Sequence, residues 1–229
     1  MKNILIIGGS SGIGKATAEM LSADHQVFAT HNKHPMENAE NCSFHALNVL
    51  DEALDFGFLP EQIDGLVYCP GAINLKPFAR IKTEDFRADY ELQVLGAVKV
   101  IQAVLPKLKV SPIASIVLFS TVAAQAGFNF HSIVSASKGA IEGLVRALSA
   151  ELAPKIRINC IAPSITDTPL AASLLGTPEK AEANAQRHPL KRVGTVQDLS
   201  NAVAFLLSEK SSWMTGQVLK VDGGMSVIK

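Results

Sequence analysis

The sequence predicts an α/β fold: one doubly wound domain of 229 residues, with a parallel sheet of about seven strands and helices on both faces. Short apolar runs alternate with longer helix-periodic segments, which is typical of βαβ units. Several of these runs lack polar alternation, as strands covered on both faces do. No repeat, low-complexity tract or linker divides the chain, so we expect a single domain over residues 1–229.

Each strand is expected at a short apolar run, and each helix at a longer segment with helical periodicity. The predicted strands are Asn3–Ile7, Gln26–Thr30, Ser43–Ala46, Gly65–Cys69, Ala114–Ser120, Lys155–Ile161 and Gln217–Val221. The predicted helices are Ile13–Ala23, Glu84–Leu108, Val134–Leu152 and Gln197–Leu207. Thr83 can cap the second helix, whereas Pro106 should bend or end it.

Charge and cysteine content exclude several classes of function. With 21 basic and 21 acidic residues the formal net charge is zero, so nothing draws the chain toward nucleic acid or anionic lipid. No apolar run approaches the roughly 18 residues of a membrane span. Cys42, Cys69 and Cys160 are odd in number and scattered, which favours reduced thiols over a disulfide framework. We expect a cytoplasmic protein with no metal, nucleic-acid or membrane partner.

The first strand runs directly into a glycine-rich turn and the start of a helix. Glycines at such a turn let the backbone approach a pyrophosphate, which then meets the N–H groups and the positive dipole end of the helix. The arrangement predicts a dinucleotide site in a Rossmann-type domain. Its predicted phosphate-binding residues are Gly8, Ser10, Ser11, Gly12, Ile13 and Gly14.

Four motifs resemble the short-chain dehydrogenase/reductase family. The spacing Gly8-x-x-x-Gly12-x-Gly14 is similar to that family's and differs from the Gly-x-Gly-x-x-Gly fingerprint of other dinucleotide-binding domains. The other motifs are Arg157–Pro163, Pro189–Gly194 and Thr215–Gly224, so the resemblance covers nearly the whole chain. It implies an NAD(P)(H)-dependent oxidoreductase acting on a carbonyl, hydroxyl or enoyl group. It also implies cofactor contacts from the segments after the fourth and sixth strands, at Gly71, Pro163, Ile165 and Thr168.

The end of the second strand bears on the choice of dinucleotide. NAD enzymes usually place an acid there, but this chain has none between residues 29 and 34. His31 and Asn32 would tolerate or attract a 2′-phosphate, which favours NADP(H) over NAD(H). Asn48 and Val49 stand where the family often has Asp-Val against the adenine. Only about a dozen residues, 32–42, join the second and third strands, so we expect little or no helix there and a thin wall beside the adenosine.

At the reaction centre the chain departs from the family it resembles. Lys138 matches the lysine that holds the nicotinamide ribose, but Val134 stands four residues earlier, where the family has its proton-donating tyrosine. Thr121 occupies the position of the serine that orients the carbonyl, and Gln93 that of the asparagine of a proton relay. The remaining departures are Tyr68-Cys69-Pro70-Gly71 for Asn-Asn-Ala-Gly, and Pro163-Ser164 for Pro-Gly.

Another group could supply the missing proton. His131 lies seven residues before Lys138, a spacing that resembles the tyrosine of enoyl-acyl-carrier-protein reductases in the same superfamily, and it would share a helix face with the lysine. Thr121 keeps a hydroxyl but is a poor acid alone. Weaker candidates are Ser132, Ser135 and Tyr68. Cys69 could act as a nucleophile, although the sequence shows no base paired with it and a buried cysteine usually serves packing.

Two functions stay open from the sequence. One is an oxidoreductase with an atypical or weakened proton donor; the other is a catalytically inactive dinucleotide-binding protein that acts as a regulatory or oligomeric partner. Residues 168–188 are predicted as a lid over a partly apolar small-molecule substrate. Small and apolar residues on the Lys138 helix suit a helix–helix contact in a homodimer or homotetramer, or packing against the chain's own sheet. They are Ala136, Gly139, Ala140, Gly143 and Leu144.

Overall fold

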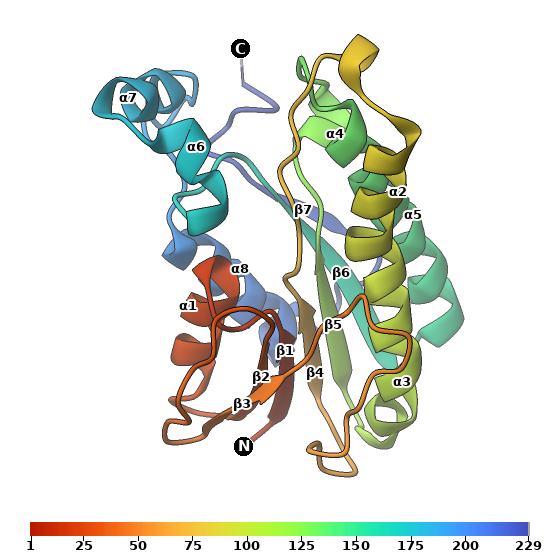
Figure 1. The fold of residues 1–229 in the computed structure, drawn as a ribbon. Helices are drawn as coiled ribbons and strands as arrows, with labels where there is room; N and C mark the ends of the chain where they lie inside the picture. Colours follow the sequence, from red (N-terminus) through yellow and green to blue (C-terminus); the bar gives the residue numbers. More distant parts are fainter. Residues whose placement is uncertain (229) are drawn as a thin grey trace.

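The computed structural model describes residues 1–228 and contains one parallel sheet of seven strands (Figure 1). The strand order across the sheet is β3-β2-β1-β4-β5-β6-β7, which reverses beside β1 as in a doubly wound fold. The predicted fold class is therefore confirmed. The strands are β1 (Asn3–Ile7), β2 (Gln26–His31), β3 (Cys42–Ala46), β4 (Gly65–Tyr68), β5 (Ala114–Phe119), β6 (Ile156–Pro163) and β7 (Val218–Val221).

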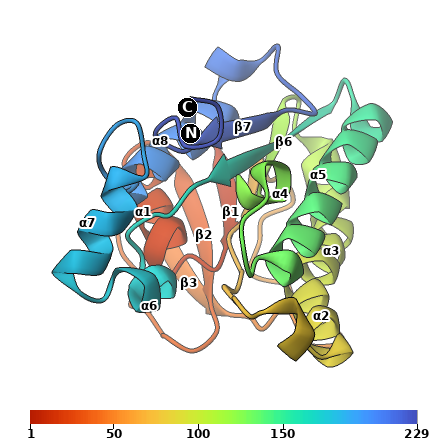
Figure 2. The same ribbon diagram turned by 90° about the horizontal axis from the view of Figure 1, so that it is seen from above.

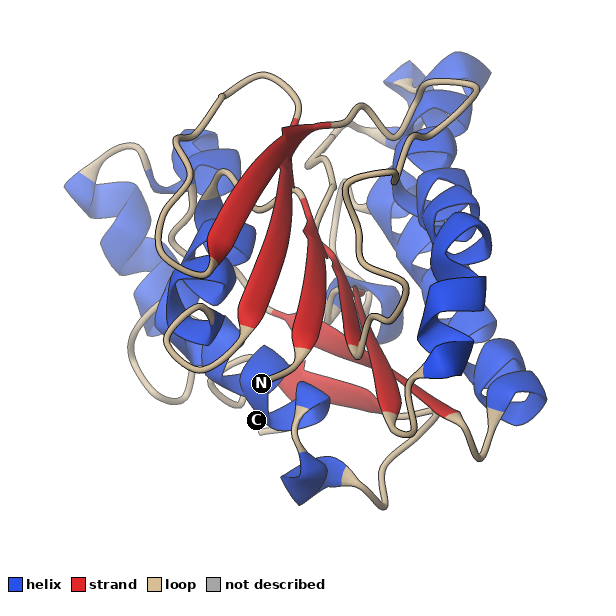
Figure 3. Ribbon diagram, turned by 90° about the horizontal axis from the view of Figure 1, so that it is seen from below, coloured by secondary structure: helices blue, strands red, loops and turns tan. Residues whose placement is uncertain are grey.

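Helices cover both faces of the sheet, as Figure 3 shows from below. The helices α1 (Gly12–Leu21) and α8 (Val196–Leu207) pack on one face, and α3 (Gly96–Val110) and α5 (Ser132–Leu152) on the other. Successive residues of β1 serve opposite faces, because side chains alternate along a strand: Ile4 and Ile6 join one apolar cluster, Leu5 and Ile7 the other. This two-sided burial explains why the apolar runs lack polar alternation.

The predicted helix Glu84–Leu108 is helical throughout, but it contains a π turn that was not predicted. It consists of α2 (Thr83–Tyr90), the π turn η2 (Glu91–Leu95) and α3. The Tyr68 hydroxyl donates to the Leu92 carbonyl at 2.5 Å, and a Cβ at Gly96 would overlap that hydroxyl oxygen. The glycine thus lets a buried tyrosine from β4 enter the helix and open one turn. Such π bulges are frequent at functional sites.

A cap at Thr83 and a helix end at Pro106 are both contradicted. Thr83 does not cap α2, since the helix begins at Thr83 itself and the carboxylate of Asp85 accepts the Lys82 N–H at 3.1 Å. Pro106 does not end α3, which continues to Val110. Near the end of a helix, packing of the buried face against the sheet can outweigh one missing backbone hydrogen bond.

The crossover between β2 and β3 is short, as predicted: residues 32–41 form no helix. Residues 47–64, which lead into β4, form none either, and they fill the sheet face with Phe56, Leu59 and Ile63. Shorter helices gather beyond the carboxyl ends of the strands (Figures 1 and 2). They are α4 (Ala123–Ala126), η3 (Pro169–Ala171), α6 (Ala172–Leu175) and α7 (Pro178–Gln186). The remaining short helices are η1 (Phe78–Arg80) and η4 (Glu209–Ser211).

Among the described helices, none combines the length and the apolar character needed to cross a bilayer.

Candidate active site

The glycine turn joins β1 to α1 in a backbone arrangement that only small residues allow. A Cβ at Gly14 would overlap the Gly8 carbonyl oxygen, so the helix start lies against the strand end. The N–H of Gly8 donates to the Thr30 hydroxyl at 3.1 Å, which ties the turn to the end of β2. Ser11 is the N-cap residue of α1, its hydroxyl makes no capping hydrogen bond, and no acidic residue stands in the first turn. This helix start suits an anion.

The residues predicted to bind the adenosine lie at the ends of β2 and β3. The carbonyl of His31 accepts the Leu47 N–H at 2.9 Å, and the amide of Asn32 lies 3.5 Å from the oxygen of Asn48. The side chain of Asn48 also donates to Asp51 at 2.7 Å, whereas Val49 is buried in the core. The structure thus gathers His31, Asn32 and Asn48 at one edge, next to the glycine turn.

A cavity of about 280 Å³ opens at the carboxyl ends of the strands. It collects predicted site residues that are far apart in the sequence: Ile13, Gly71, Gln93, Thr121, His131, Val134, Lys138, Pro163, Ile165 and Thr168. Most of its other walls are apolar, including Ile73, Leu75, Phe119, Phe128, Leu170, Leu174 and Met225. The remaining predicted cofactor residues belong to the glycine turn and the adenosine edge.

Lys138 is the most unusual group in this cavity. Its side chain comes from the second turn of α5 and is buried, and burial lowers its pKa from 10.5 to about 8 against the opposing influence of Cys160 and Asp89. No hydrogen bond or ion pair joins its ammonium group to another residue in the described part of the chain. The ammonium therefore lies buried at the cavity wall, ready for a ligand's hydroxyl groups.

Beside Lys138 lies a buried polar pair, Gln93 and Asp89, of which only Gln93 was predicted from the sequence. The amide of Gln93 donates to the carboxylate of Asp89 at 2.7 Å, and both side chains are buried. One oxygen of each group, Oδ1 of Asp89 and Oε1 of Gln93, has no hydrogen-bond partner among the described residues. Asp89 was not foreseen, although its place one helical turn before Gln93 was a usable signal. Buried oxygens without donors suit water or ligand hydroxyls.

The three residues predicted at the reaction centre all reach the cavity. Val134 is buried in its wall and offers only methyl groups. Thr121 follows β5, and its hydroxyl accepts the Ala123 N–H at 3.3 Å. His131 is the N-cap residue of α5, which begins at Ser132 and not at Val134. Its Nδ1 contacts the Asn129 carbonyl at 2.7 Å, so Nε2 is the nitrogen left to face a ligand.

Two other candidates from the sequence, Tyr68 as a proton donor and Cys69 as a nucleophile, do not suit these roles. Tyr68 does not line the cavity; its hydroxyl is bonded to Leu92 in the core, and burial raises its pKa. Cys69 does line the cavity, but burial raises the pKa of its thiol to about 12. A nucleophilic cysteine needs a lowered pKa, so this thiol serves packing.

The structure also reveals a pair of side chains that the sequence reasoning did not bring together. The Nε2 of His188 lies 2.8 Å from the hydroxyl oxygen of Ser164, and its Nδ1 lies 2.8 Å from the Asn184 carbonyl. His188 is only 3% exposed, and both residues line the cavity. Ser164 was noted as a departure from Pro-Gly, but a contact across 24 residues leaves no local signal.

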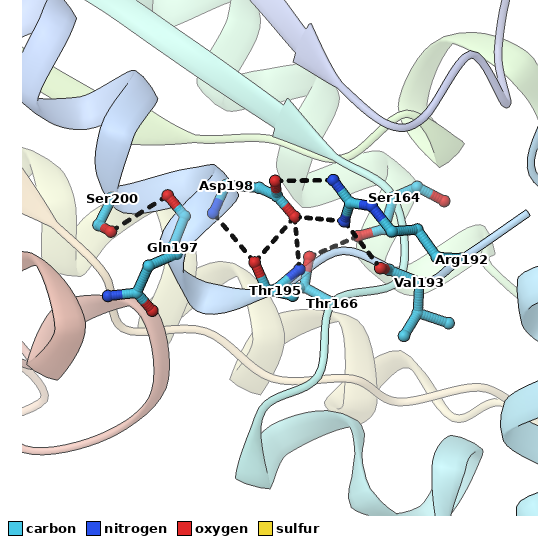
Figure 4. A network of polar contacts seen from close by, with 8 residues as sticks. All are labelled: Ser164, Thr166, Arg192, Val193, Thr195, Gln197, Asp198 and Ser200. Carbon is cyan, nitrogen blue, oxygen red and sulfur yellow. Dashed lines mark hydrogen bonds and ion pairs between the residues drawn. The ribbon is translucent and has the colours of Figure 1, made fainter. Parts of the chain in front are cut away.

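A separate polar network fixes the segment that follows β6. Arg192 binds the carboxylate of Asp198 through two nitrogens at 2.6 and 2.9 Å, and that carboxylate accepts the Thr195 N–H at 2.8 Å (Figure 4). These bonds lower the pKa of Asp198. The loop so held presents Gly194, whose N–H donates to the Ile165 carbonyl at 3.0 Å. This loop is thus hydrogen-bonded to the segment after β6, where cofactor contacts are predicted.

The segment 168–188 folds into η3, α6 and α7, and Figure 2 shows α6 and α7 beyond the carboxyl ends of the strands. It contributes Thr168, Leu170, Ala171, Leu174, Asn184, Arg187 and His188 to the lining. The role of this segment as a lid stays a prediction.

The chain is similar to several known proteins along its whole length. Residues 8–226 match the model of a family described as enoyl-(acyl carrier protein) reductase. A tropinone reductase homolog of Arabidopsis thaliana is 34% identical over 245 residues, which is 99% of this chain and 92% of the relative. The ligand-free aldohexose dehydrogenase of Thermoplasma acidophilum has a TM-score of 0.89 at 26% identity, with 100% and 95% of the two chains covered. ElxO with NADP bound has a TM-score of 0.86 at 29% identity, with 98% and 99% covered.

Proposed function

The chain belongs to the short-chain dehydrogenase/reductase family, and from this premise we propose that it is an oxidoreductase that uses NADP(H) to reduce a carbonyl or enoyl group. The reverse reaction would oxidise a hydroxyl group. The apolar walls of the cavity, among them Leu170 and Leu174, support a partly apolar small-molecule substrate.

The observation that carries this proposal is the buried ammonium group of Lys138 at the cavity wall. A buried cation costs several kcal/mol unless something pairs with it, and its lowered pKa of about 8 reflects that cost. Ribose hydroxyls would satisfy it. The glycine turn would hold the pyrophosphate, since the start of α1 has no side-chain cap and no acidic residue in its first turn.

The adenosine edge supports NADP(H) over NAD(H). Neither His31 nor Asn32 would repel a 2′-phosphate, and β2 ends without an acid. Among the structures similar to this chain, ElxO was solved with NADP bound. We expect tighter binding of NADPH than of NADH in a direct titration. Equal affinities for the two would contradict this assignment.

The residues around the reacting atoms would have separate roles in the reduction. A bound nicotinamide would supply the hydride. Lys138 would hold its ribose, and Thr121 would orient the substrate oxygen from the end of β5. Apolar walls would exclude water, which strengthens every polar contact inside. Val134 has no proton to give, so another group, with His131 as the candidate from the sequence, must complete the reduction.

A second function rests on Val134 itself. If no group replaces the tyrosine, the protein would bind the dinucleotide without turnover and act as a regulatory partner or as a subunit of an oligomer. General acid catalysis contributes about 10²–10⁴-fold, so the loss of the donor could equally leave a slow enzyme. The cofactor-binding residues would serve either function.

One experiment separates the two functions. The natural protein and Val134→Tyr would be assayed with NADPH and NADH against ketones, aldehydes, β-ketoacyl thioesters and enoyl thioesters, with cofactor binding measured in parallel. We expect turnover by the natural protein. Turnover by Val134→Tyr alone, with equal cofactor binding by both proteins, would favour the inactive binding function. Failure of both proteins to bind either cofactor would refute both functions.

We also propose that the chain forms a homo-oligomer through α5. Ala136 and Gly139 are exposed on this helix, and a Cβ at Gly139 or Gly143 would meet no atom within 4 Å. These positions therefore do not pack against the chain's own sheet and allow a second helix to approach closely. Sedimentation velocity tests this: we expect a dimer or tetramer, and a monomer at micromolar concentration would contradict it.

A further inference from the structure

The pair formed by Ser164 and His188 has a feature beyond ordinary packing, which is the way its hydrogen bonds fix the protons. The Asn184 carbonyl can only accept, so the Nδ1 of His188, at 2.8 Å, must carry a hydrogen. The Nε2 is then the nitrogen without a fixed hydrogen, and it faces the Ser164 hydroxyl at 2.8 Å. The imidazole is 3% exposed, so little of the ring meets solvent.

The hydrogen bond between His188 and Ser164 is kept in both protonation states of the ring, but the donor and the acceptor change places. With neutral imidazole, the Ser164 hydroxyl donates to Nε2. With imidazolium, Nε2–H donates to the Ser164 oxygen, and the serine hydrogen becomes available to another acceptor. A serine in contact with a positioned histidine can in this way pass a proton on.

The pair is also held in place from its far side. The C-terminal turn packs on the ring, where a Cβ at Gly223 would lie 3.5 Å from the Cδ2 of His188. The Leu190 N–H donates to the Gly223 carbonyl at 3.2 Å, and the N–H of His188 itself donates to the Ala185 carbonyl at 3.0 Å. The ring therefore has one orientation, as proton transfer at a fixed distance requires.

Ser164 lines the same cavity as the predicted reaction centre. It follows β6 directly, and the carbonyl of Pro163, one residue earlier, accepts the Val122 N–H at 3.1 Å. The strand ends that carry Thr121 and Ser164 thus run side by side. Both residues line the cavity that contains Lys138 and Val134.

We propose that Ser164 is the proton donor of this site and that His188 resupplies it, in place of a tyrosine at position 134. The assignment rests on the proposed reductase function. The reduced dinucleotide would supply hydride to the carbonyl carbon, and the substrate oxygen would take the electron pair of its π bond. The Ser164 O–H bond breaks toward that oxygen, and the Nε2–H bond breaks toward the Ser164 oxygen. Neutral His188 keeps the electron pair, so one hydride and one proton are consumed.

Four single variants test the assignment: Ser164→Ala, Ser164→Thr and His188→Gln change the proposed pair, and His131→Ala changes the competing histidine of the cavity. Each is assayed for steady-state reduction over the carbonyl panel and, separately, for NADPH binding by nicotinamide fluorescence. We expect Ser164→Ala and His188→Gln each to lower kcat by about 10²–10⁴-fold with KM and cofactor affinity little changed. Ser164→Thr, which keeps a hydroxyl, should retain most of the rate of the natural protein. The double variant with both Ser164→Ala and His188→Gln should be little slower than either of these single variants.

The outcomes are distinguishable. A kcat that survives both Ser164→Ala and His188→Gln overturns the assignment and leaves the reductase function intact. So does a loss confined to His131→Ala. Bound NADPH without turnover by the natural protein refutes the reductase function itself, and this assignment falls with it. Failure of Ser164→Thr to recover rate, with its fold and cofactor affinity retained, also counts against the serine as donor.

Discussion

Replacing Lys138 with methionine should stabilise the protein at neutral pH. Burial lowers the pKa of this lysine from 10.5 to about 8, and each pKa unit corresponds to about 1.36 kcal/mol. Carrying the charge in the folded state therefore costs about 3 kcal/mol below pH 8. A neutral side chain of similar length fills the same space without that cost. We expect Lys138→Met to raise the free energy of unfolding at pH 7 by about 3 kcal/mol while abolishing tight cofactor binding.

The pH dependence gives a second, independent check. Between pH 8 and 10.5 the unfolded chain holds the lysine proton more tightly than the folded chain, so the stability of the natural protein rises with pH across this window. The advantage of Lys138→Met should shrink to near zero by about pH 10.5. Urea unfolding followed by circular dichroism from pH 7 to 10.5 measures it.

The matched control is Lys109→Met, which changes an exposed lysine on α3. It should alter stability by no more than about 0.5 kcal/mol at any of these pH values. If Lys138→Met proves less stable than the natural protein at pH 7, or gains a constant amount at every pH, the reasoning from burial is refuted.

Two further predictions concern the turn and the loop that support the site. Gly14→Ala places a Cβ against the Gly8 carbonyl oxygen; we expect about 1–3 kcal/mol of lost stability and loss of NADPH binding, measured by urea unfolding and titration calorimetry. Asp198→Asn removes the carboxylate that binds Arg192 and caps α8, and should cost about 1 kcal/mol at pH 7. Because that pKa is lowered in the fold, the difference should shrink progressively as pH drops below about 3.9, and a difference as large at pH 2 as at pH 7 would argue against the ion pair.

The sheet could be predicted because its signals are local. Each strand is a short apolar run, and the alternation of Ile4 and Leu5 between two cores follows from the geometry of a strand. The glycine turn is equally local, since Gly8 and Gly14 meet within one turn. Lys138 could be found from its motif alone. Its burial and its lowered pKa could not, because they arise from neighbours on other elements.

Errors and omissions occur where distant segments meet. The π turn at Glu91–Leu95 forms because Tyr68, from another strand, inserts its hydroxyl beneath the helix. The hydrophobic periodicity of the helix residues gives no indication of the Tyr68 side chain. Asp89 was overlooked for a related reason, since its burial depends on the contact between helices.

What the sequence alone determined is the βαβ order and the glycine turn, because each depends on residues close together in the chain. What only the tertiary structure decided is which polar groups share the cavity with Lys138. The 2.8 Å contact of Ser164 with His188 exists because the segment after β6 and the segment after α7 line the same cavity. Side chains 24 positions apart acquire joint chemistry only when folding removes them from water and fixes their distance.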